Sequence, residues 1–470
     1  MQKTKIICTI GPSSDHPHII SKLIQSGMNV ARLNMAHSSY SHIESVVKTI
    51  RTESKRLNCY VGIMMDLSGP KIRLDLSGIT GNEITIEKDH IYQLGFSKMN
   101  DIPINIDLTF NHVDPTNAYV KIDDGKLSFK IIKSDKKFLR VKAENDCVIK
   151  NNKGVNFPGV ELDIPSLTHK DEKDILKAID LDIDWIALSF VRSSSDINSI
   201  YKILNNSNVK IPIIAKIEKP EAIENLDSII EEFQGILIAR GDLGVELPLS
   251  KLPVLQKNII EKCRKLKKPV IVATQMLESM IDSNTPTRAE INDVANAVFE
   301  ESDAVMLSGE TAVGEFPIET VKIMKKIISD VENNNVNNNL DKYEIKLDND
   351  TRSAIGDSVK TISKHMHIDG IVVMTESGST ARVVGHFRPS VNIFAFTPHS
   401  NICRQMTLLW GVTPIFMSEC LTTDDMLINA EKILLKNEYM NKGDTFILTA
   451  GIPIGVSGAT NMLKIQKIKD

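Results

Sequence analysis

The sequence has few aromatic residues and no long apolar run. Phe, Trp and Tyr make up 5% of its 470 residues. No apolar stretch approaches the roughly 18 residues that a membrane span requires. The first residues, as far as Gly11 and Pro12, hold only a short apolar stretch, whereas a signal peptide needs a longer one. We therefore expect a cytoplasmic protein with no membrane partner.

The chain also lacks an excess of charge of either sign. It contains 56 Lys and Arg against 60 Asp and Glu, for a formal net charge of -4. Because no long run of like charge occurs, nothing predicts a surface for nucleic acid or for an anionic membrane. The composition, 42% hydrophobic and 25% charged, is typical of a globular protein.

Cysteines are few and far apart. None forms a Cys-x-x-Cys pair, and none lies near histidines at zinc-ligand spacing. We therefore predict reduced thiols at all six positions, which are Cys8, Cys59, Cys147, Cys263, Cys403 and Cys420.

Eight short apolar segments alternate with amphipathic stretches. Continuous apolar strands separated by helices predict a parallel sheet covered by helices. Eight such units over about 250 residues favour a (β/α)₈ barrel, with a doubly wound open sheet as the alternative. The eight predicted strands are residues 5–10, 28–34, 60–66, 185–190, 211–218, 235–240, 269–274 and 303–308.

Two further regions have sequence patterns different from this alternation of strands and helices. One interrupts it and the other follows it. Residues 70–160 contain short β-like runs and turn signals such as Asp124-Gly125, which predict a small inserted all-β domain. It leaves the barrel at the end where such folds carry their chemistry, so we expect a lid. The stretch ENNNVNNN, Glu332 to Asn339, predicts a linker to a third, α/β domain. The predicted boundaries are 1–69 with 161–335 for the barrel, 70–160 for the lid and 336–470 for the C-terminal domain.

Polar residues lie where the predicted barrel strands end. Lys216 and Glu218 are two apart on one strand and therefore face the same side. Each of these residues has an ordinary structural alternative, such as an ion pair, a turn or a helix cap. The strand-end set comprises Arg32, Asn34, Lys216, Glu218, Asp242 and Thr274.

Together these side chains predict metal-assisted chemistry on an anion. Hard carboxylate oxygens suit Mg²⁺, which prefers one or two carboxylates together with substrate oxygens and water. Arginine and lysine beside such a metal suit a phosphoryl group. The residues alone therefore indicate a small phosphorylated or carboxylated substrate.

Nine motifs in the chain resemble those of the pyruvate kinases, in the same order and from end to end. The resemblance implies a barrel, an inserted β lid and a C-terminal α/β domain, usually in a homotetramer. It also implies phosphoryl transfer from phosphoenolpyruvate to ADP, the last step of glycolysis, followed by protonation of the enolate to pyruvate. The motifs are TKIICTIGPSS, NVARLNMAH, DLSGPKIR, KGVNFPG, AKIEKPEAIEN, ARGDLGVE, ATQMLESM, PTRAEINDVANAV and DAVMLSGETA.

The resemblance implies roles for the strand-end residues. Glu218 and Asp242 would bind the divalent ion, Mg²⁺ or Mn²⁺. Lys216 and Arg32 would contact the transferring phosphoryl group, where charge stabilises a loose transition state.

The substrate carboxylate would lie against Gly241, Asp242 and Thr274, again by resemblance. Thr274 also lies on the route that delivers a proton to the enolate in this family. Because a secondary alcohol is too weak an acid to act alone, we expect a water chain at this position.

The resemblance places ADP against four residues. His37 has an alternative as a helix-start residue and Lys153 as a solvated turn. Arg73 lies at the hinge into the lid, so lid closure would bring it onto the phosphates and exclude competing water. The four predicted nucleotide-binding residues are Asn34, His37, Arg73 and Lys153.

One region departs from the family pattern. Typical members hold K⁺ with Asn and Ser side chains of R-x-N-x-S-H and with Asp and a carbonyl of D-T-K-G-P-E-I-R. Asn34 and Asp66 remain here, but Ala36 replaces Ser, Leu67 replaces Thr and Lys71 replaces Glu. A lysine ammonium near this place repels K⁺ and makes it redundant. We therefore predict that activity does not require K⁺; the alternative is that Lys71 turns into solvent.

A phosphate-binding loop is a further possibility in the C-terminal domain. Amides and hydroxyls that open a helix suit a phosphorylated effector, with an ordinary helix cap as the alternative. Glu376 would repel a phosphate dianion, so activation by a sugar bisphosphate does not follow. The candidate residues are Thr375, Ser377, Gly378, Ser379 and Thr380.

Two other function classes stay open. A Mg²⁺-dependent barrel lyase or aldolase acting on pyruvate-like enolates would share the acids and Arg32, but it would need no nucleotide-binding lid. A catalytically inactive regulatory relative would keep the fold, although it would have no reason to keep Lys216 and its neighbours.

Overall fold

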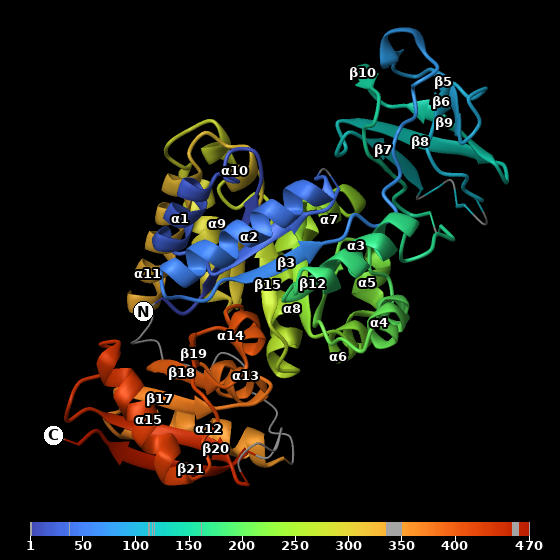
Figure 1. Cartoon of the computed structure of the whole chain (residues 1–470). Coiled ribbons are helices and arrows are strands. Elements are labelled where there is room, and N and C mark those ends of the chain that lie inside the picture. Colours follow the sequence, from blue (N-terminus) through green and yellow to red (C-terminus); the bar gives the residue numbers. More distant parts are fainter. Residues whose placement is uncertain are drawn as a thin grey trace.

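A closed barrel of eight parallel strands forms the centre of the molecule (Figure 1). The structure is a computed structural model that describes residues 2–36, 38–110, 113–114, 116, 118–160, 162–334, 350–453 and 460–469. Neighbouring strands follow the order β1-β16-β15-β14-β13-β12-β3-β2, which confirms the predicted barrel and excludes the open sheet. The strands are β1 (Lys5–Ile10), β2 (Val30–Asn34), β3 (Gly62–Asp66), β12 (Trp185–Leu188), β13 (Ile213–Ile217), β14 (Gly235–Ala239), β15 (Val270–Ala273) and β16 (Ala304–Leu307).

Amphipathic helices cover the outside of this barrel. Two of them begin at capping boxes, at Thr168 before α3 (His169–Asp180) and at Thr287 before α9 (Arg288–Phe299). Such caps satisfy backbone N–H groups that the first helical turn leaves unpaired. The other longer helices are α1 (Pro17–Ser26), α2 (Tyr40–Arg56), α4 (Ile197–Asn206), α6 (Leu226–Glu232), α8 (Leu252–Lys265) and α11 (Pro317–Asn334).

The segment between β3 and β12 forms two sheets with a hydrophobic core of their own, antiparallel except for the parallel pair β5 and β6. Figure 1 shows it beyond one end of the barrel, opposite the C-terminal domain. Asp124 and Gly125 both have positive φ, as the predicted turn requires. The strands are β4 (Glu83–Ile86), β5 (Ile91–Gly95), β6 (Ile102–Pro103), β7 (Tyr119–Ile122), β8 (Leu127–Ser134), β9 (Phe138–Ala143), β10 (Cys147–Lys150) and β11 (Val155–Asn156).

This inserted segment touches the barrel at the end of α7 (Arg240–Glu246). The Lys121 ammonium donates to the carbonyl of Val245 at 2.6 Å. The amide of Asn156 donates to the Glu246 carboxylate at 2.8 Å. The inserted domain is thus in direct contact with the helix that follows β14 and that carries Asp242.

A five-stranded sheet with order β19-β18-β17-β20-β21 organises the C-terminal part. Its four parallel strands match the prediction, whereas the antiparallel β21 was not predicted. The strands are β17 (Gly370–Met374), β18 (Asn392–Thr397), β19 (Val412–Phe416), β20 (Thr445–Gly451) and β21 (Thr460–Lys467), and the helices are α12 (Thr351–His365), α13 (Ser379–His386), α14 (Ser400–Met406) and α15 (Thr423–Lys436).

The predicted linker was partly wrong. Helix α11 continues to Asn334, so residues 332–334 are helical, because the helix packs on the barrel through its buried apolar face as far as Val331. Residues 335–339 lie outside the described residues. The exact domain boundaries stay a prediction.

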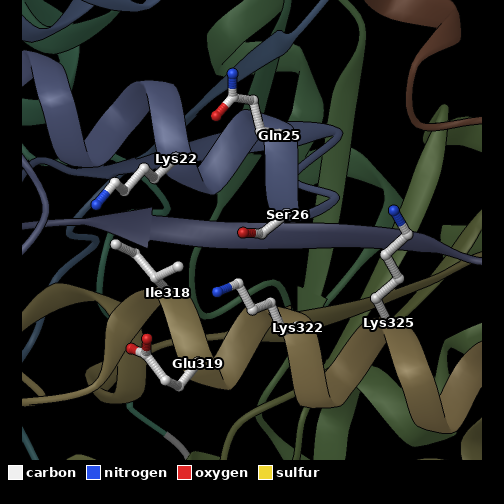
Figure 2. A pocket seen from close by; sticks show the side chains of 7 residues that line it. All are labelled: Lys22, Gln25, Ser26, Ile318, Glu319, Lys322 and Lys325. Carbon is white, nitrogen blue, oxygen red and sulfur yellow. The ribbon is translucent and has the colours of Figure 1, made fainter.

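A groove lies on the flank of the barrel, between α1 and α11 (Figure 2). Lys22, Lys322 and Lys325 line it together with Glu319. Its lining includes none of the predicted site residues, so this groove is not the candidate site. No helix in the described part of the chain is long and apolar enough to cross a membrane.

Candidate functional site

The buried carboxylate of Asp66, at the end of β3, organises the barrel mouth. Arg32 of β2 donates to Asp66 Oδ2 through Nε at 2.7 Å and Nη2 at 2.5 Å. The Lys216 ammonium of β13 lies 3.1 Å from Asp66 Oδ1. Burial by itself raises the pKa of Asp66, but Lys216 and Arg32 hold it below its ordinary value. Asp66 therefore stays ionised and positions two cations from different strands.

Lys216 is held by three groups at once. Besides Asp66, its ammonium lies 3.0 Å from Glu218 Oε1 and donates to Ser189 Oγ at 2.8 Å. Burial lowers the pKa of Lys216, but the Asp66 and Glu218 charges outweigh this and the pKa is raised. The side chain is 11% exposed, so a charged ammonium faces the mouth from a fixed position.

Glu218 and Asp242 present hard oxygen ligands to the same mouth. Glu218 is buried and its Oε2 accepts the Phe190 N–H at 2.8 Å. Burial raises the pKa of Glu218, the Lys216 charge lowers it and the nearby Asp242 charge raises it further. Two carboxylates close enough to repel fit a divalent cation, which relieves that repulsion. No group of three or more His, Cys, Asp or Glu in the described ranges could hold a metal, so substrate and water oxygens would complete such a site.

Thr274 and Gly241 are joined by a direct hydrogen bond. The Gly241 N–H donates to Thr274 Oγ1 at 2.7 Å, and the hydroxyl donates to the Ala273 carbonyl at 2.6 Å. Thr274 has a φ of 70°, in the region that β-branched residues avoid. Arg240 fixes this turn by donating to the Thr274 carbonyl at 2.8 Å. The predicted helix-cap alternative is thus partly realised, because Thr274 accepts an N–H of the first turn of α7.

The region predicted to lack K⁺ has its oxygens engaged. Asn34 Oδ1 accepts the Ala36 N–H at 3.0 Å, and the Leu67 carbonyl accepts the Ser189 hydroxyl at 2.7 Å. The Lys71 ammonium lies 4.0 Å from Asp242 Oδ1. Lys71 is therefore not turned wholly into solvent but faces the predicted divalent-metal ligand.

Two predicted nucleotide residues have side-chain contacts within the described part of the inserted domain. Arg73 donates to the Asn152 carbonyl at 2.9 Å. Lys153 forms an ion pair with Asp123 at 2.8 Å. The structure does not bring either of them to Lys216. His37, the third, lies outside the described residues.

The predicted effector loop connects β17 to α13. Gly378 has a φ of 76°, and Ser377 donates to Ser379 at 3.3 Å. Glu376 pairs with His399 at 2.9 Å. The Thr380 hydroxyl shares a hydrogen bond with Thr460, and Thr375 closes the start of the loop through a backbone bond to β18. The Ser377–Ser379 hydrogen bond lies within the loop, whereas the other contacts tie the loop to β18, His399 and Thr460.

Sequence reasoning missed residues that hold the site together. Ser189, one residue past β12, bonds both Lys216 and the Leu67 carbonyl. The rule that polar residues at strand ends are functional would have found it. Thr9 of β1 accepts from Arg32 at 3.0 Å. Its place inside an apolar strand gave no signal.

The fold and this mouth define a class of protein. A closed barrel with paired carboxylates, a buried lysine and an arginine at its strand ends is an enzyme of the metal-assisted phosphoryl-transfer or enolate class. The family model for the pyruvate kinase barrel domain matches residues 1–321, and that for the pyruvate kinase alpha/beta domain matches residues 353–466. The chain belongs to the pyruvate kinase family, and is thus a phosphotransferase.

Individual relatives agree with this assignment. A pyruvate kinase of Staphylococcus epidermidis is 41% identical over all of this chain and 81% of its own length, and one of Staphylococcus aureus gives the same values. The crystal structure of a pyruvate kinase from Cryptosporidium parvum matches with a TM-score of 0.91 at 34% identity, covering 99% of this chain and 96% of that one. Pyruvate kinases use phosphoenolpyruvate and ADP and generally need Mg²⁺.

Proposed function

We propose that the barrel mouth transfers the phosphoryl group of phosphoenolpyruvate to ADP, with Mg²⁺ or Mn²⁺ and without K⁺. The observation that carries this proposal is the placement of Lys216 and Arg32 on the common anchor Asp66. Two fixed cations suit a phosphoryl group whose charge spreads over its equatorial oxygens in the transition state.

Glu218 and Asp242 are the residues that would hold the divalent ion. Such an ion supplies electrostatic stabilisation to the substrate oxygens that it contacts. Lys216 contributes its ammonium to the transferring group, and Asp66 and Ser189 keep that ammonium in place. Arg32 grips the same group from β2.

The substrate carboxylate lies against the first turn of α7 in this proposal. Gly241 and Asp242 open that helix, and Thr274 is bonded to Gly241. The Thr274 hydroxyl is already engaged with Ala273, which supports a role in orienting water for enolate protonation, with no role as the acid itself.

Binding of ADP in this proposal requires the inserted domain, which acts as a lid. Arg73 and Lys153 are bonded within the inserted domain, while Asn34 lies on β2. We propose that closure of this domain brings Arg73 and Lys153 to the phosphates of ADP, with His37 contributing from the barrel. Water would be excluded at the same step.

Independence from K⁺ is supported by the contacts of Lys71. Its ammonium lies 4.0 Å from Asp242 Oδ1. Asp66 is neutralised by Arg32 and Lys216, so it keeps little attraction for a monovalent cation. Glu218 and Asp242 also face lysines, and a divalent ion, with twice the charge of K⁺, would compete better for their oxygens.

The remaining proposals concern the whole protein. We propose a cytoplasmic homotetramer, as is usual in this family. The loop at residues 375–380 would be the place for a phosphorylated effector, but Ser377 bonds Ser379 there and Glu376, which pairs with His399, would repel a phosphate.

The test is a coupled assay of the purified chain with phosphoenolpyruvate, ADP and Mg²⁺ in tetramethylammonium buffer. ATP and pyruvate should both form at a rate that added K⁺ leaves unchanged. Absence of ATP formation from phosphoenolpyruvate and ADP would instead favour the lyase class or an inactive relative. Strong activation by K⁺ would refute only the K⁺ proposal.

A further inference from the structure

The carboxylate of Glu246, at the C-terminal end of α7, joins three parts of the molecule. Its side chain is 2% exposed. Its Oε1 accepts the side-chain amide of Asn156, in the inserted domain, at 2.8 Å. The same oxygen pairs with the ammonium of Lys219 at 2.5 Å. One buried oxygen thus connects α7, the loop that follows β13 and the inserted domain.

The two barrel segments that Glu246 connects each carry one proposed metal ligand. Lys219 directly follows Glu218 at the end of β13. Asp242 lies in the first turn of α7, the helix that ends at Glu246. A helix of this length, only about 10 Å, moves as a unit, so a shift of its last residue also shifts its first turn. The ion pair between Glu246 and Lys219 therefore fixes the separation of Glu218 and Asp242.

The inserted domain reaches the same end of α7 through two neighbouring side chains. Asn156 of β11 lies directly opposite Lys121 of β7 in their antiparallel pair. Asn156 donates to Glu246, and Lys121 donates to the Val245 carbonyl at 2.6 Å. The last two residues of α7 thus hold this edge of the lid, and a rotation of the lid acts directly on the helix that carries Asp242.

Phe190 provides a second connection between the lid hinge and Glu218. Its N–H donates to Glu218 Oε2 at 2.8 Å, and its ring centroid lies 5.9 Å from Lys219 Nζ. Gly69, at the hinge, has a φ of 64°, and a Cβ added there would lie 2.7 Å from the Phe190 ring. The hinge backbone therefore packs directly against the residue that orients Glu218.

We propose that Glu246 is a positioning residue of the divalent-metal site, which sets the spacing of Glu218 and Asp242 and couples that spacing to the position of the inserted domain. Glu246 acts through Lys219 and α7, and we assign it no contact with the ion. The inference rests on the proposed function, because it takes Glu218 and Asp242 as the metal ligands. An ion pair with a purely structural role would stabilise the barrel and leave the affinity for the metal unchanged.

The first test measures the affinity of the full chain for Mn²⁺ without substrates, from the EPR signal of the free ion. Glu246→Ala should raise the Kd about tenfold or more, as is usual when a residue that orients a metal ligand is lost. Glu246→Gln should bind almost as tightly as the wild type. Both donors contact Oε1, and an amide oxygen can accept both of their hydrogen bonds.

The control for this test is Glu53→Ala. It removes a carboxylate that pairs with Arg56 on the barrel exterior, and it should leave the Kd for Mn²⁺ unchanged. A wild-type Kd in Glu246→Ala would overturn the proposal. Equal weakening in Glu246→Ala and Glu246→Gln would also overturn it, because the effect would then come from the lost charge and not from the position of the ligands.

The second test measures the lid by hydrogen exchange of the full chain, with and without Mn²⁺. The amides of residues 154–160 report how firmly its edge is held. Mn²⁺ should slow their exchange in the wild type, and this slowing should be lost in Asn156→Ala. Because coupling is reciprocal, the Kd for Mn²⁺ should rise in Asn156→Ala by no more than the factor by which Mn²⁺ slows exchange in the wild type. Slowing by Mn²⁺ that persists in Asn156→Ala would refute the coupling.

The control for the second test is Asn145→Ala. Asn145 bonds Lys126 and Ser128 within the same domain, so this variant should exchange like the wild type near residues 154–160. If Glu246→Ala does not fold, the comparison of Asn156→Ala with Asn145→Ala decides the proposal, since both keep the pair between Glu246 and Lys219.

The two levels of the inference fail in different ways. A wild-type chain that does not bind Mn²⁺ would contradict the proposed metal ligands and this inference with them. Binding to the wild type that Glu218→Gln weakens and Glu246→Ala does not would contradict this inference alone.

Discussion

Replacing Lys216 by Met should separate the fold of this protein from its chemistry. A cation about 4 Å from a charged oxygen is worth about 4 kcal/mol at the effective dielectric constant of a partly buried site. At 1.36 kcal/mol for each factor of ten, this corresponds to about a thousandfold loss of kcat for phosphoryl transfer. Proton exchange at the methyl group of pyruvate needs no charge on a phosphoryl group and should partly survive.

The same change should destabilise the chain. Lys216 separates Asp66 from Glu218, at 3.1 and 3.0 Å. Loss of one partner of a buried ion pair costs about 3–5 kcal/mol, and because Asp66 keeps Arg32 we expect the lower end, about 3 kcal/mol. The raised pKa of Lys216 means that its contribution is fully present below the ordinary lysine value and is lost only as pH rises past the folded value. Measurements at pH 7.5 therefore capture the full effect.

The assay is steady-state ATP formation at saturating substrates, together with urea unfolding of the same samples. Lys177→Met, which removes a lysine that pairs with Glu44 on the barrel exterior, serves as the control and should keep its activity. Near-normal ATP formation by folded Lys216→Met would refute the role assigned to the ammonium. Loss of ATP formation with equal loss of methyl proton exchange would show that the whole site, and not one charge, had been removed.

Three further outcomes are expected. Glu218→Gln and Asp242→Asn should each raise the Mg²⁺ concentration for half-maximal activity at least tenfold, since one anionic ligand is lost. The control Glu319→Gln, on the barrel flank, should leave that concentration unchanged. If neither site variant changes the Mg²⁺ titration, the metal binds elsewhere. Lys71→Glu combined with Ala36→Ser should create a K⁺ requirement in tetramethylammonium buffer, and a double variant that stays indifferent to K⁺ would contradict the account of that region. Thr274→Val should lower the free energy of unfolding by about 1–3 kcal/mol, because the Gly241 N–H loses its acceptor. The same variant should slow enolate protonation. Unfolding curves identical to those of the wild type would contradict the hydrogen bond between Gly241 and Thr274.

The barrel was predictable because the same pattern, an apolar strand alternating with an amphipathic helix, occurs eight times in the sequence. All eight predicted segments contain a barrel strand, with ends one or two residues shorter at positions such as Trp185–Leu188. Parallel strands buried on both faces read as continuous apolar runs. Antiparallel β21 was missed because it is partly exposed and its apolar residues are interrupted by Lys464. The first residues of the predicted linker continue α11, because that helix packs on the barrel as far as Val331 and the Glu332 carboxylate accepts the N–H groups of Lys3 and Thr4.

The site was predictable only in part. The rule that barrel enzymes carry functional residues at strand ends predicted Lys216, Glu218 and Asp242. It applies because the register of a parallel barrel brings successive strand ends to one mouth. The sequence did not predict that the Asp66 carboxylate anchors cationic side chains from two other strands, because this depends on which side chains of three strands reach one carboxylate. The sequence likewise does not show that Arg73 and Lys153 are engaged within the lid, because those contacts are set by its tertiary packing.

The most direct test of the central proposal measures where the phosphoryl group of phosphoenolpyruvate goes. Purified chain, phosphoenolpyruvate, ADP and Mg²⁺ are mixed in K⁺-free buffer and followed by ³¹P NMR. Each phosphoenolpyruvate signal lost should be matched by one γ-phosphate of ATP, with no inorganic phosphate and no change on adding K⁺. Loss of phosphoenolpyruvate with release of inorganic phosphate, or no loss at all in a folded sample, would contradict the account.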